Sequence, residues 1–290
     1  MVARSITSAC MARSARTRSI SSTLKRTSCL LLGEEAFDNR PCMLEADARQ
    51  ILESSEVILL DMCGTFMFGH DRFGPSEDYA QTYRALGGKN LSAKSVQQAV
   101  TACFDTLNRI YENVARQDSF PSVLSTLRSV FETREWPESD VLLVERVFAA
   151  HERGHVPDEY ADALRFLVRG HRLALVSNIW SKKSLYVEEL ERVGLMDVFE
   201  VTIFSSDGSD VKPSRTLFDR AIHSMQVDRA KAVVIGDSLH RDIGGASAAG
   251  LKSIWINRAC REPGPHEPRA DAWIPGLLDL TSKEMTSNPD

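Results

Sequence analysis

Val57-Ile-Leu-Leu-Asp61-Met-Cys-Gly-Thr65 joins an apolar run to a carboxylate, a glycine and a hydroxyl. Four consecutive aliphatic residues predict a strand that is buried on both faces, as strands of parallel sheets are. Ligands of open α/β sheets bind beyond the carboxyl ends of the strands, so Asp61 is a candidate nucleophile or metal ligand. On this segment alone, an ordinary turn aspartate is an equally good interpretation.

Further apolar runs later in the chain predict the other strands of the sheet. They lie at 172–176, 198–204, 232–235 and 253–256, with a weaker one at 272–274. Helical patterns separate most of them, at 181–193, 213–225 and 242–249. Strands that alternate with helices predict a parallel sheet with right-handed crossovers, and therefore an α/β fold.

A long helical insert interrupts this alternation after the first strand. Ser92 is a helix start, and the apolar residues after it recur at spacings of three and four, which predicts one buried stripe. The aromatic and glycine-rich segment 66–75, just before the insert, predicts a tight hairpin or flap. The predicted organisation is a core of residues 44–74 and 170–282, a helical insert at 75–169 and a tail at 283–290.

Polar residues follow the predicted strands at the places where ligands bind in such sheets. Ser177 and Asn178 end the second strand, Lys212 follows the third, and Asp237 and Asp242 follow the fourth. Each has a plain interpretation as a helix cap or a solvated lysine. Their occurrence on successive strand ends favours one site that holds a nucleophile, a hydroxyl, a lysine and carboxylates able to share a hard cation with Asp61.

This order of motifs resembles the haloacid dehalogenase-like (HAD) hydrolase superfamily. The motifs read Asp61-Met-Cys63-Gly-Thr65, Val-Ser177-Asn178, Lys212-Pro and Gly-Asp237-Ser through Asp242, so the likeness spans about 56 to 280. It implies a Rossmann-like parallel sheet core, and the helical insert is similar to the superfamily's type-1 cap.

The resemblance also implies a Mg2+-dependent phosphatase of a small phosphorylated metabolite that forms an aspartyl-phosphate on Asp61. The catalytic residues would be Asp61, Cys63, Ser177, Lys212 and Asp242. The phosphate-binding residues would be Thr65, Ser177, Asn178 and Lys212. The metal ligands would be Asp61, Asp237, Asp242 and Cys63, the last through its main-chain carbonyl.

Cys63 departs from the superfamily pattern, because most phosphatases of this kind carry an aspartate there that protonates the leaving oxygen. A thiol with a reference pKa of about 8.5 is a poor general acid, and general acid–base assistance is worth roughly 10²- to 10⁴-fold. The departure leaves three hypotheses: a phosphatase that is slow or acts on good leaving groups, a dehalogenase- or phosphonatase-type hydrolase, and a catalytically weak binding protein.

The first thirty residues are rich in Arg, Ser and Thr, and no acidic residue precedes Glu34. This composition predicts that residues 1–42 are a mitochondrial transit peptide, or else a plastid signal. The alternatives are a disordered basic tail of a cytoplasmic protein, and a misassigned start codon, since Met43 would also open the folded part. The whole chain carries a net charge of −5, and without this segment it is more acidic, which disfavours nucleic-acid binding.

Two further features bear on compartment and partners. No apolar run approaches the ~20 residues needed to cross a bilayer, which predicts a protein without a membrane span. The six cysteines form no C-x-x-C pair, which favours a reducing compartment. The sequence carries no signal for an oligomeric state.

Overall fold

The computed structural model describes residues 41–130 and 136–281. The helices are α1 Pro41–Glu53, α2 Tyr79–Ala85, α3 Ala93–Tyr111, α4 Val123–Val130, α5 Glu138–Glu152, α6 Asp158–Leu167, α7 Ser184–Arg192, α8 Arg215–Met225 and α9 Gly244–Ala248. The strands are β1 Val57–Leu60, β2 Arg172–Ser177, β3 Phe199–Phe204, β4 Ala232–Gly236, β5 Lys252–Ile256 and β6 Ala272–Ile274. Short 3-10 turns are η1 Val114–Arg116, η3 Met196–Val198, η4 Ser205–Asp207, η5 Arg229–Lys231 and η7 Leu277–Leu280, and η6 Leu239–Ile243 is a π-helical turn.

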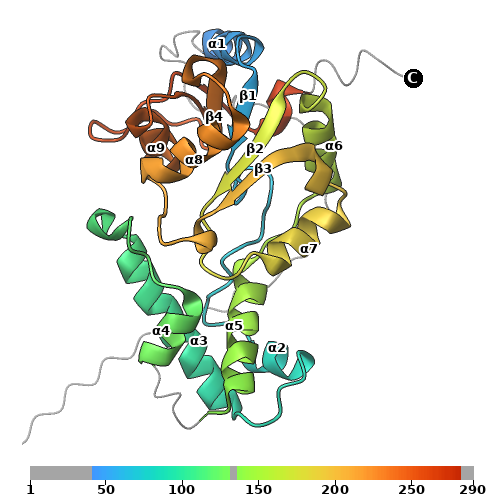
Figure 1. Ribbon diagram of the computed structural model, residues 1–290, viewed down its shortest axis with the longest axis vertical. Coiled ribbons are helices and arrows are strands. Elements are labelled where there is room, and N and C mark those ends of the chain that lie inside the picture. Colours follow the sequence, from blue (N-terminus) through green and yellow to red (C-terminus); the bar gives the residue numbers. More distant parts are fainter. Residues whose placement is uncertain (1–40, 131–135, 282–290) are drawn as a thin grey trace, which may run out of the picture. The chain divides into compact units, whose positions relative to one another are not determined.

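The six described strands form one parallel sheet in the order β3-β2-β1-β4-β5-β6. Figure 1 labels the first four of these, β3, β2, β1 and β4. Val57 lies beside Arg172 of β2 on one side and beside Ala232 of β4 on the other. This is the strand order of Rossmann-like folds, in which the direction of winding reverses at the first strand. The predicted α/β fold with a parallel sheet is confirmed.

Strand β1 is buried on both faces because helices cover each side of the sheet. Val57 and Leu59 pack with apolar residues of α8 and α9, which cover one face. Ile58 and Leu60 pack with residues of α1, α6 and α7, which cover the other face. All four side chains have zero exposure, as the uninterrupted aliphatic run predicted.

Helices α2 to α5 pack around a hydrophobic cluster of their own. It includes Tyr83, Val100, Leu107, Leu127 and Phe148. The long helix α3 begins as the sequence predicted, with the Ser92 side chain accepting a hydrogen bond from the Ser95 amide. Among the described helices, none combines the length and apolar character that a membrane span requires.

Of the hairpin or flap predicted for residues 66–75, the hairpin is not formed, and the flap stays a prediction. Phe68 pairs instead with His155, and their amides and carbonyls exchange two hydrogen bonds of 2.9 Å in an isolated antiparallel bridge. The local sequence could not indicate this, because the partner follows helix α5. The targeting prediction for 1–42 and the predicted tail at 283–290 concern segments that lie, except for residues 41–42, outside the described residues.

Candidate active site

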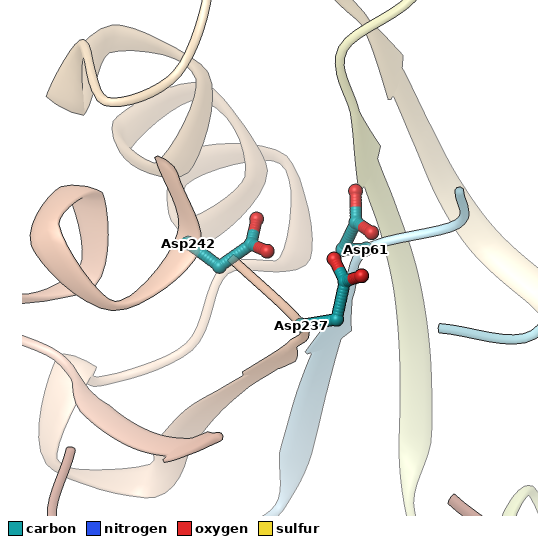
Figure 2. Close-up of side chains that lie close together, drawn as sticks. All are labelled: Asp61, Asp237 and Asp242. Carbon is teal, nitrogen blue, oxygen red and sulfur yellow. The ribbon is translucent and has the colours of Figure 1, made fainter. Parts of the chain in front are cut away.

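Three carboxylates meet at the carboxyl ends of the two central strands. Asp61 follows β1, Asp237 follows β4, and Asp242 lies in the π-helical turn η6. One oxygen atom from each lies within 4.8 Å of the other two, and Figure 2 shows the three side chains converging. The reversal of strand order between β1 and β4 opens the sheet at this point, which is where α/β folds bind ligands.

Two glycines permit this close approach of the carboxylates to the main chain. A β-carbon at Gly64 would lie 2.1 Å from Asp237 Oδ2, and Gly64 also has a φ of +78°. A β-carbon at Gly236 would lie 2.4 Å from the carboxyl carbon of Asp242. Any side chain at either position would displace a carboxylate of the cluster.

Lys212 places a buried ammonium group between two of the carboxylates. Its Nζ donates to Asp61 Oδ1 and to Asp242 Oδ1, each at 2.6 Å, and to the Val176 carbonyl at 2.9 Å. The lysine is 2% exposed, so these contacts are shielded from water. Lys212 comes from the loop before α8, and Ser214 rather than Lys212 caps that helix.

The carboxylates affect one another through their negative charge. Burial, followed by the charges of Asp61 and Asp242, raises the pKa of Asp237 to about 7. Burial and the charge of Asp61 raise the pKa of Asp242 to about 6, although Lys212 opposes the shift. This accumulation of negative charge favours binding of a cation.

The hydroxyl and amide groups of the predicted site differ in their availability. Ser177 Oγ is buried and has no hydrogen-bond partner among the described residues, so it is free to donate to a ligand. Thr65 Oγ1 donates to Asp61 Oδ2 at 3.1 Å and orients that carboxylate. The Asn178 side chain is engaged inside the protein, since its Oδ1 accepts from the Lys212 amide at 2.8 Å.

Cys63 is partly buried and lies between Asp61 and Gly64 in the loop after β1. Burial, and then the negative charge of Asp61, raises the pKa of the Cys63 thiol well above its ordinary value. The thiol therefore stays protonated at neutral pH and gives up its proton reluctantly.

The residues present suit a hard divalent cation such as Mg2+. Asp61, Asp237 and Asp242 offer carboxylate oxygens, which are the ligands that Mg2+ prefers. They already crowd negative charge into one place, which a divalent ion would neutralise. The predicted role of the Cys63 carbonyl as a further ligand stays a prediction.

Sequence reasoning missed three residues next to this cluster. The Arg258 guanidinium donates to the Gly64 carbonyl, lies 3.7 Å from Asp237 Oδ2 and sits over the Phe68 ring. It follows β5, so the rule that strand ends line the site could have identified it. Arg241 bonds the Lys212 carbonyl and Tyr111 bonds Asn178, and no sequence signal indicated either contact.

Comparison with known proteins shows a likeness to one family model and to two curated relatives. The family model described as haloacid dehalogenase-like hydrolase matches residues 143–256, a range that includes Ser177, Lys212, Asp237 and Asp242. Pyrimidine 5'-nucleotidase YjjG of Escherichia coli is 33% identical over 97 residues, which are 33% of this chain and 42% of the relative. Phosphoserine phosphatase of Thermus thermophilus is 33% identical over 115 residues, which are 38% of this chain and 44% of the relative. The chain thus matches less than half the length of each.

Solved structures share the fold over a larger part of the chain. A 2-haloacid dehalogenase from Pseudomonas syringae pv. Tomato superposes with a TM-score of 0.53 at 20% identity, covering 81% of this chain and all of that one. This likeness extends well beyond the length that the family model matches. The family-model match over residues 143–256, with the strand order and the strand-end residues, supports membership of the haloacid dehalogenase-like hydrolase superfamily, and the solved structure shows the shared fold.

Proposed function

We propose that this chain is a Mg2+-dependent phosphohydrolase that acts on a small phosphorylated metabolite through Asp61. The observation that carries the proposal is the Lys212 ammonium, held 2.6 Å from both Asp61 Oδ1 and Asp242 Oδ1 beside a third carboxylate. Catalysis of phosphoryl transfer depends mainly on positioning and on neutralising the charge of the phosphoryl oxygens. The names of both relatives, a pyrimidine 5'-nucleotidase and a phosphoserine phosphatase, support a phosphate ester as substrate.

The reaction proceeds in two displacements at phosphorus. A carboxylate oxygen of Asp61 attacks the phosphorus atom, and the bond to the leaving oxygen breaks, with its electron pair departing on that oxygen. Water then attacks the phosphorus of the aspartyl-phosphate, which releases inorganic phosphate and regenerates Asp61. Lys212 neutralises charge on the phosphoryl group, and the unpartnered Ser177 hydroxyl donates to one of its oxygens. Mg2+, when held by Asp61 and Asp237, adds positive charge at the same place.

Cys63 limits which substrates turn over quickly. Its raised pKa makes it a weak proton donor, so an alkyl leaving group would depart as a poorly stabilised alkoxide. We therefore propose a preference for acyl or aryl phosphates, whose leaving oxygens need little protonation.

We also propose that helices α2 to α5 act as a cap over the site. We propose further that residues 1–42 direct the protein to the mitochondrion.

The proposal is tested by measuring phosphate release from acyl, aryl and alkyl phosphates with Mg2+. Asp61→Asn should abolish release, while the exposed Asp197→Asn should leave it unchanged. Cys63→Asp should speed alkyl ester hydrolysis by roughly 10²-fold, since it restores a general acid.

Different outcomes separate the remaining hypotheses. If neither wild type nor Cys63→Asp releases phosphate from any substrate, the phosphohydrolase assignment is wrong. If only Cys63→Asp is active, the native reaction has another leaving group, and release of halide or cleavage of a phosphonate by the wild type would identify the dehalogenase- or phosphonatase-type alternative. A wild type that binds phosphate without any turnover would indicate a binding protein.

A further inference from the structure

Tyr111, at the C-terminal end of α3, is linked to Lys212 through two intermediate side chains, Asn178 and Arg241. The Tyr111 hydroxyl accepts a hydrogen bond from Asn178 Nδ2 at 2.8 Å, and its main-chain carbonyl accepts one from Arg241 Nη2 at 2.6 Å. The Arg241 guanidinium also lies over the Tyr111 ring, 3.6 Å from its centroid. Two residues from different strand ends therefore hold the side chain and main chain of Tyr111.

The same two residues hold the main chain of Lys212. The Lys212 amide donates to Asn178 Oδ1 at 2.8 Å. The Lys212 carbonyl accepts from Arg241 Nη1 at 3.0 Å and from Asn178 Nδ2 at 3.2 Å. Both polar main-chain groups of Lys212 are thus bonded by side chains that also bind Tyr111.

The chain that follows α3 adds main-chain contacts to the same loop. The Val211 amide donates to the Gln117 carbonyl at 2.7 Å, and the Phe120 amide donates to the Ser209 carbonyl at 2.8 Å. Residues that follow α3 therefore bond the loop at Ser209 and Val211, just before Lys212. These main-chain hydrogen bonds join the helical insert directly to the loop that carries Lys212.

Arg241 is a buried arginine whose side chain bonds no carboxylate in the described part of the chain, which is uncommon for a charged residue. It is 9% exposed, and its hydrogen bonds in the described part of the chain go to two carbonyls rather than to a carboxylate. A buried guanidinium is costly unless its donors are satisfied, and its planar fork suits two acceptors together with an aromatic face. Burial raises the pKa of Tyr111 to about 12, so the phenol stays neutral and does not offset the Arg241 charge.

We propose that Tyr111 and Arg241 are positioning residues for Lys212, which couple the seating of the α3 end to the location of the ammonium group. With Tyr111 seated, Asn178 and Arg241 fix the Lys212 main chain, and the Nζ reaches Asp61 and Asp242. With Tyr111 displaced, Asn178 and Arg241 each lose a hydrogen-bond partner. The main chain of Lys212 is then held less firmly. The coupling rests on geometry alone, whereas its effect on catalysis rests on the proposed function.

The test combines hydrogen exchange with steady-state kinetics on the full-length protein. Tyr111→Phe removes the hydroxyl acceptor of Asn178 but keeps the ring under Arg241, and Arg241→Lys keeps the charge but loses the fork. In both variants the amides of residues 209–212 and 214 should exchange roughly three- to tenfold faster, the change expected for loss of one ordinary hydrogen bond. With an aryl phosphate and Mg2+, kcat should fall by a similar factor while KM changes by less than about twofold, because the transition state depends more on Lys212 placement than ground-state binding does.

Matched substitutions control for general effects of losing a hydroxyl or a guanidinium. Tyr160→Phe alters a ring that packs edge-on against Phe68, and Arg229→Lys alters a partly exposed arginine that pairs with Asp219. Neither contacts the Lys212 loop in any described interaction. Both should leave kcat and the exchange at residues 209–212 and 214 unchanged.

The coupling is wrong if hydrogen exchange at residues 209–212 and 214 is unchanged in both variants. It is also wrong if Tyr111→Phe raises KM and leaves kcat unchanged, which would mean that Tyr111 contacts the substrate. If the wild type releases no phosphate from any substrate, exchange alone decides. Faster exchange in both variants then supports the coupling, and only the proposed function fails.

Discussion

Lys212 keeps its positive charge inside the protein because carboxylates surround its ammonium group. Burial by itself favours the neutral amine, but the charges of Asp242 and Asp61 outweigh it and raise the pKa of Lys212 above its ordinary value. The ammonium in turn offsets the repulsion between these two carboxylates, each 2.6 Å away. The structural role of Lys212 and its proposed catalytic role therefore belong to one side chain.

Replacing Lys212 with Met should affect both roles, because it keeps much of the side-chain volume and removes the charge. Unfolding free energy in urea at pH 7 should fall by about 3 kcal/mol, since buried carboxylates lose their partner. Phosphate release should fall at least ~100-fold. Lys183→Met, which breaks a largely exposed pair with Asp207, should cost less than about 1 kcal/mol. Equal losses in the two variants would contradict this account.

Site residues that follow predicted strands could be predicted from the sequence. Residues whose contacts lie far away in the chain could not. Asp61, Lys212, Asp237 and Asp242 each follow a strand with a clear apolar signal, and the fold brings them together. Tyr111 fell on the buried stripe of a helix, where a core role was the better prediction. Its contact with Asn178 depends on how α3 meets the sheet, which no local pattern encodes.

Helix α5 ends against the loop that follows β2. Glu152, its last residue, is 4% exposed and accepts hydrogen bonds from the Trp180 amide at 2.6 Å and the Ser181 amide at 2.9 Å. Burial raises the pKa of Glu152 to about 7 although these hydrogen bonds oppose the shift. One helix end thus fixes the main chain just beyond Ser177.

This helix end should make stability depend on pH. The folded-state pKa of Glu152, about 7, lies above its ordinary 4.5, so the folded protein holds this proton more tightly than the unfolded chain does. The resulting stabilisation is complete below about pH 4.5 and is lost as pH rises through about 7. It amounts to ~3 kcal/mol at most, at 1.36 kcal/mol per pKa unit.

Glu152→Gln should therefore flatten the decline of unfolding free energy between pH 4.5 and 8. Urea titrations across this range provide the measurement, and the exposed Glu188→Gln is the control, which should retain the wild-type slope. An unchanged slope in Glu152→Gln would show that other groups cause the decline.

Elements with strong local signals were predicted well, and the segment that pairs at a distance was not. The aliphatic run of β1 and the Ser92 cap of α3 each follow from their own residues. The segment after Thr65 pairs through Phe68 with His155, so its glycines and aromatic residues were misread as a hairpin.

The whole molecule concentrates negative charge at the reversal of its strand order. Asp61 and Asp237 follow the two central strands, and with Asp242 they place three carboxylates within 4.8 Å of one another. The fold therefore holds these carboxylates close enough to repel one another, and a bound cation would reduce that repulsion.

Mg2+ should accordingly stabilise the folded protein as a whole. At ten times its dissociation constant, a ligand that binds only the folded state adds ~1.4 kcal/mol to the unfolding free energy. Urea unfolding with Mg2+ and with EDTA measures this difference, and Asp237→Asn should remove most of it. The same increase in both proteins would reflect a general ion effect rather than this site.

The central position of β1 has a consequence for synthesis on the ribosome. The strand is made early, but its neighbours β2 and β4 follow only after the helical insert, and Lys212 is 151 positions beyond Asp61. A nascent chain thus carries a four-residue aliphatic strand with both edges unpaired while most of the protein is still being translated. Binding by a chaperone, or early docking of α1, would have to shelter Val57–Leu60 during that interval.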